Sequence, residues 1–331
     1  MTIRRTVTVA VALLALAIPA FAHARLAYVK TVGGAEWIYL AADDGSGAVK
    51  SIKGSNPALS PDGTLVALSR FDSSGPHLII ARADLSGEKA PPLACIGPAV
   101  WSPDSRQLAC WEDELTQTLK VVDVVTDAIT SIGTSQLGAG ASFSPDSTRI
   151  VWGKQVNASR NDLYVTTIAT VASGRIVRNG GFPIWSATDR IAYAHLKRRG
   201  GASYPVSNVW VVRPNGSGAH ALTRIPTPDP LLSGLTPIAW SQDGKRLIAG
   251  YGGQDTDDVW TIDLRRHRAR DLTGRFDGVW ATAISRDGRY VLAQTGGPEA
   301  SLAQSTVVRY TFGGRSRRTL AAHAGNATWT R

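Results

Sequence analysis

The sequence predicts an all-β fold, a seven-bladed β-propeller built from four-stranded antiparallel blades. A short stretch of the form apolar–Ser-Pro-Asp-Ser/Gly–apolar recurs along the chain, and three of its six intervals are 42 residues long. A period of roughly 40–45 residues with four strands in each repeat is typical of propeller blades. The composition agrees, because 33 glycines, and 10 tryptophans against 6 phenylalanines, suit a turn-rich β protein.

The repeat is clearest at residues 99–111, which read AVWSPDSRQLACW. Proline presets the backbone of a turn and aspartate bonds back to nearby amides, so Ser-Pro-Asp between two apolar runs predicts a tight turn between strands. The aligned positions are Ser60, Ser102, Ser144, Ser186, Ser241, Ser285 and, as a half-match, Thr330. Their intervals are 42, 42, 42, 55, 44 and 45 residues.

Each full repeat predicts further strands after the turn. The second strands are expected at 65–69, 108–111, 150–152, 191–194, 247–249 and 290–293. The third strands are expected at 77–83, 119–125, 163–168, 209–213, 259–264 and 306–312. A weaker fourth segment follows, as at 269–273, so each repeat supplies one four-stranded blade.

The two ends of the chain complete the count. Residues 25–29 match a second strand and 37–42 a third strand, with no Ser-Pro-Asp strand before them. Residues 326–330 match the missing first strand. We therefore expect the C-terminal strand to pair with the N-terminal blade, which closes the ring and protects two sheet edges.

Residues that recur at one register are expected to be structural. The turn carboxylates are interpreted as hydrogen-bond acceptors within their own turns: Asp62, Asp104, Asp146, Asp243 and Asp287. Trp101, Trp185, Trp240 and Trp329 occupy one position of the first strand. They are interpreted as packing between neighbouring blades.

Residues 1–24 predict a secretory signal peptide. Two arginines precede the uncharged apolar run 6–21, and Ala22-His23-Ala24 is a small-x-small cleavage site. The run is too short for a membrane span, and no other stretch reaches that length. The expected mature propeller, 25–331, has 307 residues and a net charge of +8, and is periplasmic or secreted.

The only cysteines are Cys95 and Cys110. Export permits a disulfide between them, but sequence cannot fix their distance, so a disulfide and two buried free thiols both stay open.

At the turn motif the chain resembles the TolB-like β-propeller family, whose repeat reads roughly W-S-P-D-G-x-x-L-A-F. Residues 101–110 and 59–68 match it closely, and weaker copies extend over 25–331. The resemblance implies a propeller alone, without the N-terminal domain that TolB carries. It is specific for the fold rather than for function, because prolyl-oligopeptidase-type propellers and oligogalacturonate lyases resemble TolB at the same repeat.

Function is expected where the repeats differ. The 55-residue interval contains two insertions, 195–207 and 226–235, which the strand order places on one face of the propeller. The ligand-binding candidates are His195, Lys197, Arg198, Arg199, Tyr204 and Asp229. Arginine and lysine suit a carboxylate or phosphate, and a tyrosine suits an aromatic wall. A solvated basic loop is the alternative interpretation.

Two arginine-rich loops are expected to share the opposite face as a basic patch. They contribute Arg265, Arg266, Arg268 and Arg270 from one repeat, and Arg315, Arg317 and Arg318 from the next. Such a patch suits an anionic cell-wall polymer, lipid head groups or an acidic protein, and the alternative is a surface that only aids solubility.

No motif for nucleophilic catalysis, phosphate binding or clustered metal ligation is present, so no cofactor or metal is expected. The sequence therefore favours an exported, monomeric, non-enzymatic propeller that binds an envelope protein or anionic cell-wall polymer, and not nucleic acid. The alternative is a lyase or hydrolase acting on an acidic saccharide or small ester, with His195 and the arginines of the inserted loop, Arg198 and Arg199, in a site at the central channel.

Overall fold

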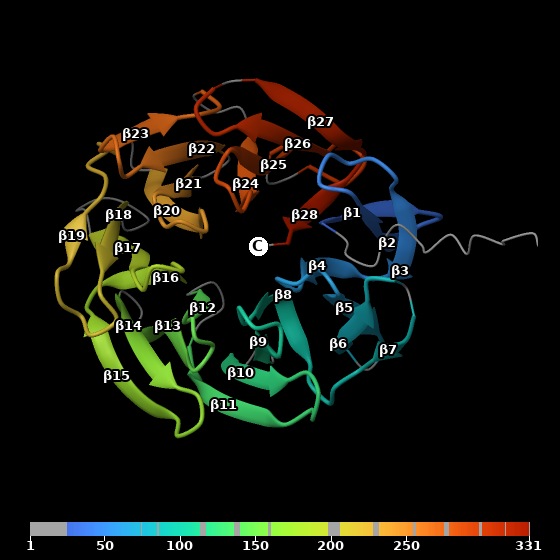
Figure 1. The fold of residues 1–331 in the computed structure, drawn as a ribbon, viewed down its shortest axis with the longest axis horizontal. Helices are drawn as coiled ribbons and strands as arrows, with labels where there is room; N and C mark the ends of the chain where they lie inside the picture. Colours follow the sequence, from blue (N-terminus) through green and yellow to red (C-terminus); the bar gives the residue numbers. More distant parts are fainter. Residues whose placement is uncertain are drawn as a thin grey trace, which may run out of the picture.

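The computed structural model describes residues 25–73, 75–84, 86–112, 117–135, 140–157, 160–197, 206–227, 232–253, 256–274, 278–297, 300–314 and 316–330. Over these ranges the chain forms 28 β-strands and no α-helix. The strands are grouped into radial sheets around a central axis, so the protein is a β-propeller (Figure 1).

Three four-stranded sheets follow the order of the chain. One contains β4 (Ser55–Leu59), β5 (Leu65–Asp72), β6 (Gly75–Arg82) and β7 (Glu88–Lys89). The next contains β8 (Cys95–Trp101), β9 (Gln107–Glu112), β10 (Thr118–Asp123) and β11 (Ile129–Thr134). The third contains β12 (Ala141–Phe143), β13 (Arg149–Asn157), β14 (Arg160–Thr167) and β15 (Ala172–Val177).

Two further four-stranded sheets lie at the end of the chain. One contains β24 (Val279–Ile284), β25 (Tyr290–Thr295), β26 (Thr306–Thr311) and β27 (Arg317–Ala322). The other has the order β28-β1-β2-β3, with β28 (Gly325–Trp329), β1 (Leu26–Val32), β2 (Ala35–Ala41) and β3 (Val49–Lys53). The innermost strand of this last sheet comes from the C-terminal end, and Leu26 pairs with Trp329.

The remaining sheet has eight strands. It contains β16 (Gly180–Trp185), β17 (Ile191–Lys197), β18 (Val206–Val212), β19 (His220–Ala221), β20 (Leu232–Trp240), β21 (Arg246–Gly253), β22 (Thr256–Asp263) and β23 (Arg268–Asp271). A parallel bridge between Ser207 of β18 and Gly234 of β20 joins its two halves. A Cβ atom at Gly234 would lie 2.3 Å from the Ser207 carbonyl oxygen, so this approach requires glycine.

The described strands thus fall into six hydrogen-bonded sheets rather than seven. The expected four-stranded antiparallel sheets are present, whereas the count of seven blades and the closure of the ring stay predictions.

The core lies between neighbouring sheets. One apolar position of the second strand is fully buried in sheet after sheet, at Val66, Leu108, Ile150, Ile191, Leu247 and Val291. Burying such a side chain contributes roughly 1.5–3 kcal/mol each. The periodic pattern in the sequence is therefore the pattern of contacts between sheets.

Several strands run further than the sequence predicts. The second strand expected at 150–152 extends over Arg149–Asn157, and its outer residues pair with Arg160 and Asn161 of β14. These outer residues are polar or exposed, so they carry no apolar signal that could mark them as strand.

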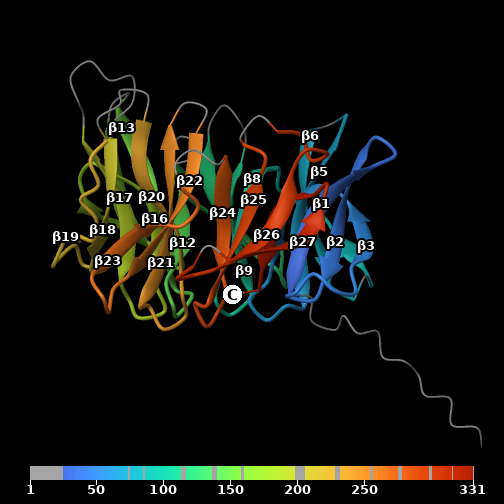
Figure 2. The same cartoon turned by 90° about the horizontal axis from the view of Figure 1, so that it is seen from above.

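The strands run between two loop faces (Figure 2). We name the end that carries the Ser-Pro-Asp-type turns, at 60–64, 102–106, 144–148, 186–190, 241–245 and 285–289, the turn face. We name the opposite end, where the hairpins between second and third strands lie, the insertion face.

A disulfide joins Cys95 of β8 to Cys110 of β9, with 5.6 Å between the two Cα atoms. Both cysteines are almost fully buried, in an apolar cluster with Leu78, Ile80 and Trp101. The bond therefore lies at the junction of two neighbouring sheets.

Across the described ranges, no helix is long and apolar enough to cross a membrane.

Candidate functional site

The turn carboxylates are bonded within their own turns. In the turn after β8, the Ser102 hydroxyl donates to Asp104 Oδ1 at 2.6 Å, and the Arg106 amide donates to the same oxygen at 3.1 Å. The Gln107 amide in turn donates to Ser102 Oγ at 2.9 Å. The corresponding serine–aspartate bond recurs at Asp62, Asp146, Asp243 and Asp287. These aspartates stabilise turns on the rim of the turn face.

The same bonds lower the pKa of four of these carboxyls, Asp62, Asp146, Asp243 and Asp287. The hydrogen bond from the Ser144 hydroxyl is the main reason that the pKa of Asp146 lies below its usual value. At Asp62, Asp243 and Asp287 partial burial raises the pKa, but the turn hydrogen bonds outweigh it and the net pKa is lowered, with nearby basic groups adding to the effect at Asp243 and Asp287.

We expect acid to destabilise the protein through these turns. A carboxyl whose folded pKa is lowered contributes stability above its unfolded pKa of about 3.9, and loses it as the pH falls through the folded pKa. Urea unfolding between pH 2 and pH 7 should show a free energy of unfolding that falls steeply below about pH 4. The variant Asp146→Asn should show a shallower acid limb, and an identical slope would contradict this role.

A pocket of about 390 Å³ lies at the centre of the turn face, where the first strands end. We name it the central pocket. Its apolar wall includes Trp101, Phe143, Ile184, Trp185 and Trp240 from four first strands. Gln242 and Arg286 bring polar groups to it from the turns.

The central tryptophans are fixed by hydrogen bonds. Trp101 Nε1 donates to the Ala58 carbonyl at 2.7 Å and Trp240 Nε1 donates to the Ile184 carbonyl at 3.2 Å, both in the preceding first strand. Trp185 Nε1 donates to Asp189 Oδ1 at 2.9 Å. The aromatic wall is therefore held in place before any ligand arrives.

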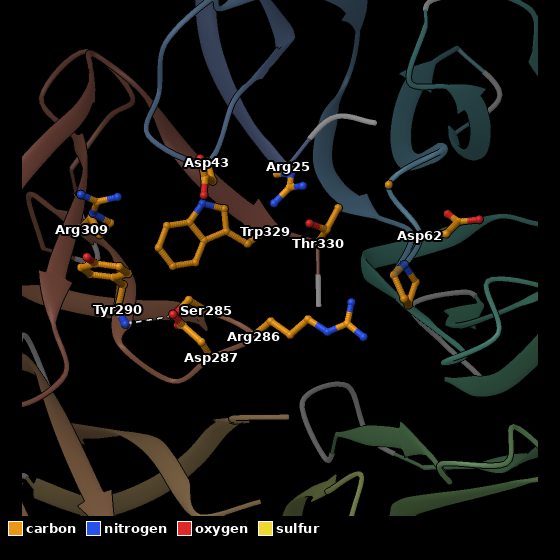
Figure 3. Close-up of a pocket in the computed structure, with 12 residues that line it drawn as sticks. Arg25, Asp43, Asp62, Ser285, Arg286, Asp287, Tyr290, Arg309, Trp329 and Thr330 are labelled. Carbon is orange, nitrogen blue, oxygen red and sulfur yellow. Dashed lines mark hydrogen bonds between the residues drawn. The ribbon is translucent and has the colours of Figure 1, made fainter. Parts of the chain in front are cut away.

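A second pocket, of about 420 Å³, lies between the Ser285 turn and the Ser60 turn (Figure 3). We name it the gap pocket. It lies at the sheet in which β28 and β1 come from opposite ends of the chain, so no Ser-Pro-Asp turn links these two strands. Its charged residues are three arginines and three aspartates, Arg25, Arg286, Arg309, Asp43, Asp62 and Asp287.

The gap pocket also holds two aromatic side chains. The Arg309 guanidinium lies 4.3 Å from the ring centre of Tyr290, a cation–π contact. The buried Trp329 Nε1 has no hydrogen-bond partner among the described residues. Because Pro61, Asp62 and Arg286 line both pockets, the central and gap pockets adjoin, and we name the two together the turn-face groove.

A third pocket, of about 460 Å³, lies between the β22–β23 hairpin and the turns flanking β25 and β26. We name it the arginine pocket. Of the predicted basic patch it contains Arg266, Arg268 and Arg270, together with Arg246 and Arg289. Arg265 is exposed in the adjoining turn, where its amide donates to Asp263 Oδ1 at 3.0 Å.

The other described arginines of the predicted patch do not line this pocket. Arg317 and Arg318 are exposed on β27, and Arg318 Nη2 lies 3.9 Å from Asp44 Oδ2. Arg315 is outside the described residues.

The candidates at the first insertion are described only in part. His195 on β17 packs against Trp210, with 4.7 Å between ring centres, and burial lowers the pKa of its imidazole. Its buried Nδ1 has no hydrogen-bond partner in the described part of the chain. Lys197 is exposed at the end of β17. Arg198, Arg199, Tyr204 and Asp229 are outside the described residues.

Sequence reasoning missed the arginines that begin the second strands. Arg190 Nη2 donates to the Gly244 carbonyl at 2.7 Å, and Arg246 Nη1 donates to the Gly288 carbonyl at 2.8 Å, each in the next turn of this type along the chain. The available signal was a basic residue four or five places after the turn serine, at Arg106, Arg149, Arg190, Arg246 and Arg289.

Within the described ranges, no three His, Cys, Asp or Glu side chains lie together in a way that could hold a metal ion.

No protein-family model matches the sequence, and no curated protein matches it. Solved structures do match. TolB from Acinetobacter baumannii is 16% identical with a TM-score of 0.55, and the match covers 93% of this chain and 66% of that one. An oligogalacturonate lyase from Vibrio parahaemolyticus is 14% identical with a TM-score of 0.59, covering 91% and 85%.

A puromycin-hydrolyzing peptidase from Mycobacterium tuberculosis is 16% identical with a TM-score of 0.62, covering 92% of this chain and 54% of that one. The chain thus spans just under two thirds of TolB and about half of the peptidase. At these identities the likeness concerns the fold. The chain has the fold of the TolB-like β-propellers.

Proposed function

We propose that the chain is an exported, non-enzymatic and monomeric β-propeller that binds a protein or an anionic cell-envelope ligand through its loop faces. Residues 1–24 direct export, and the propeller acts in the periplasm or outside the cell. TolB among the similar structures, the disulfide and the basic composition support this proposal.

The main structural support for the binding function is the turn-face groove. It joins a rigid aromatic wall to a set of arginines and aspartates, and Arg286 belongs to both parts. Aromatic and arginine side chains at the centre of a depression are the residue types that dominate protein interfaces. A groove of balanced charge suits a partner with both polar and apolar contacts.

We further infer that the propeller has seven blades and a closed ring. The eight-stranded sheet then counts as two blades joined by the bridge between Ser207 and Gly234, and the pairing of β28 with β1 supports closure.

Affinity capture from envelope extracts tests the binding function and its face. We expect the intact chain to capture a partner, and Arg286→Glu to reduce capture at least tenfold. The control Arg178→Glu changes an exposed arginine between β15 and β16 and should capture normally. If Lys197→Ala/Arg198→Ala/Arg199→Ala alone abolishes capture, the insertion face is the binding face. Recovery of no partner contradicts the proposal.

The competing function is a lyase or hydrolase acting on an acidic saccharide or small ester at the channel. One observation favours it, the buried His195 Nδ1 that no described group bonds. Metal analysis of the purified protein and assays with polygalacturonate and p-nitrophenyl acetate test it. Turnover by the intact chain that His195→Gln abolishes would replace the binding function with this one.

A further inference from the structure

The arginine pocket concentrates positive charge at the junction of two sheets. Five arginines line it against one aspartate, Asp263. Asp263 is already engaged by its own turn, because its Oδ1 accepts the amides of Arg265 and Arg266 at 3.0 and 3.2 Å. The wall therefore carries a large excess of positive charge.

Two of the five guanidinium groups are anchored. Arg246 Nη1 donates to the Gly288 carbonyl at 2.8 Å, and its guanidinium lies 5.1 Å from the Phe312 ring centre. Arg270 Nη1 donates to the Gly313 carbonyl at 2.8 Å. Both bonds cross from one sheet to the next, and each uses one of the five N–H donors that a guanidinium carries.

The other arginines reach the pocket from its rim. Arg266 and Arg289 have side chains that are 80% and 75% exposed, and their closest carboxylate oxygens lie at 3.9 and 3.6 Å. Exposed pairs at such distances bind weakly, so a ligand can displace them. Thr261, Thr311, Gly313 and Gly314 complete the wall with small groups that leave room for a ligand.

We propose that the arginine pocket binds a ligand carrying two or more phosphate groups. Arginine binds phosphate through paired hydrogen bonds, and several guanidiniums in one pocket favour a polyvalent anion over a single carboxylate. Among the described lining residues the only aromatic ring is that of Phe312, and Arg246 covers it, so the site recognises charge and shape rather than a stacked ring. This inference rests on the proposed function, since it names the chemistry of the anionic ligand.

Calorimetric titration of the full chain with sodium pyrophosphate tests the site. We expect saturable binding at one site, and at least a tenfold loss of affinity in Arg266→Gln/Arg268→Gln, which leaves both anchored arginines in place. The control Arg178→Gln/Arg224→Gln removes the same charge from exposed positions outside the pocket, and should bind within twofold of the intact chain. Equal losses in both variants, or no binding by the intact chain, would overturn the inference.

Vesicles distinguish the source of the phosphate. Sedimentation with cardiolipin vesicles, whose head group carries two phosphates, but not with phosphatidylcholine vesicles, abolished by Arg266→Gln/Arg268→Gln, identifies lipid head groups. Pyrophosphate binding without sedimentation identifies a soluble phosphorylated ligand. The variant Arg286→Glu separates this inference from the proposed function. It should bind pyrophosphate normally while failing to capture its partner.

Discussion

Replacing both cysteines by alanine is expected to lower the free energy of unfolding by roughly 3 kcal/mol. The disulfide closes a loop of 15 residues between β8 and β9, and breaking it frees the unfolded chain more than the folded one. Both cysteines also belong to a buried apolar cluster with Leu78 and Trp101, so the variant adds a small packing loss to the loss of the crosslink.

Urea denaturation of the intact chain and of Cys95→Ala/Cys110→Ala measures this difference. Reductant should lower the midpoint of the intact chain toward that of the variant and leave the variant unchanged. Because both cysteines are almost fully buried, reduction of the folded protein should be slow and should accelerate in urea. Equal midpoints under oxidising conditions would contradict a stabilising role.

The sequence was sufficient for the parts of the fold that repeat. Each Ser-Pro-Asp turn is stabilised by local hydrogen bonds. Ser102, for example, donates to Asp104 two residues later, and accepts from the Gln107 amide five residues later in the adjoining strand. The second strands follow because their apolar residues, such as Leu108 and Ile150, recur at one register. The β-propeller prediction is confirmed. It was possible because local turn chemistry and the periodicity of the apolar residues both indicate this architecture.

The pockets could not be predicted in the same way. Each gathers side chains from turns that the chain separates widely, as where Arg246 meets the Gly288 carbonyl 42 residues further on. The sequence indicated a charged loop at 265–270 but did not indicate that Arg289 would lie beside it. The gap pocket lies where no Ser-Pro-Asp turn joins β28 to β1. Because no motif is present at that place, the sequence does not indicate which side chains line the pocket.

The joining of two halves into one eight-stranded sheet could not be predicted from the sequence either. Its bridge depends on one glycine approaching Ser207, whose hydroxyl oxygen lies 2.9 Å from both the Ser233 and the Leu235 carbonyl oxygens, so that its single hydrogen is shared between them. These contacts tie the second insertion to the end of β18. Nothing in the local sequence around Gly234 marks it as the point where two strands meet in parallel.

Deleting residues 325–331 is expected to have the largest effect of any change considered. It removes β28, exposes the edge of β1 and empties the space of Trp329, which is 5% exposed in a cluster with Leu26, Tyr28 and Leu292. Loss of one buried tryptophan side chain costs roughly 3–5 kcal/mol, against a total stability of about 5–15 kcal/mol. With the strand pairing also lost, most of the truncated protein should be unfolded or aggregated at 25 °C.

Circular dichroism and light scattering of the truncated chain test whether it is unfolded or aggregated. Two point variants then distinguish the effect of losing the strand pairing from the effect of changing the tryptophan side chain. Trp329→Phe keeps most of the volume and removes an Nε1 that no described group bonds, so it should cost less than Trp101→Phe, which loses the 2.7 Å bond to Ala58. A synthetic peptide of residues 325–331 should restore the native spectrum of the truncated chain by pairing with β1. If the truncated and intact proteins had the same melting temperature, exposing the edge of β1 would not destabilise the protein, and the prediction that β28 is required would be wrong.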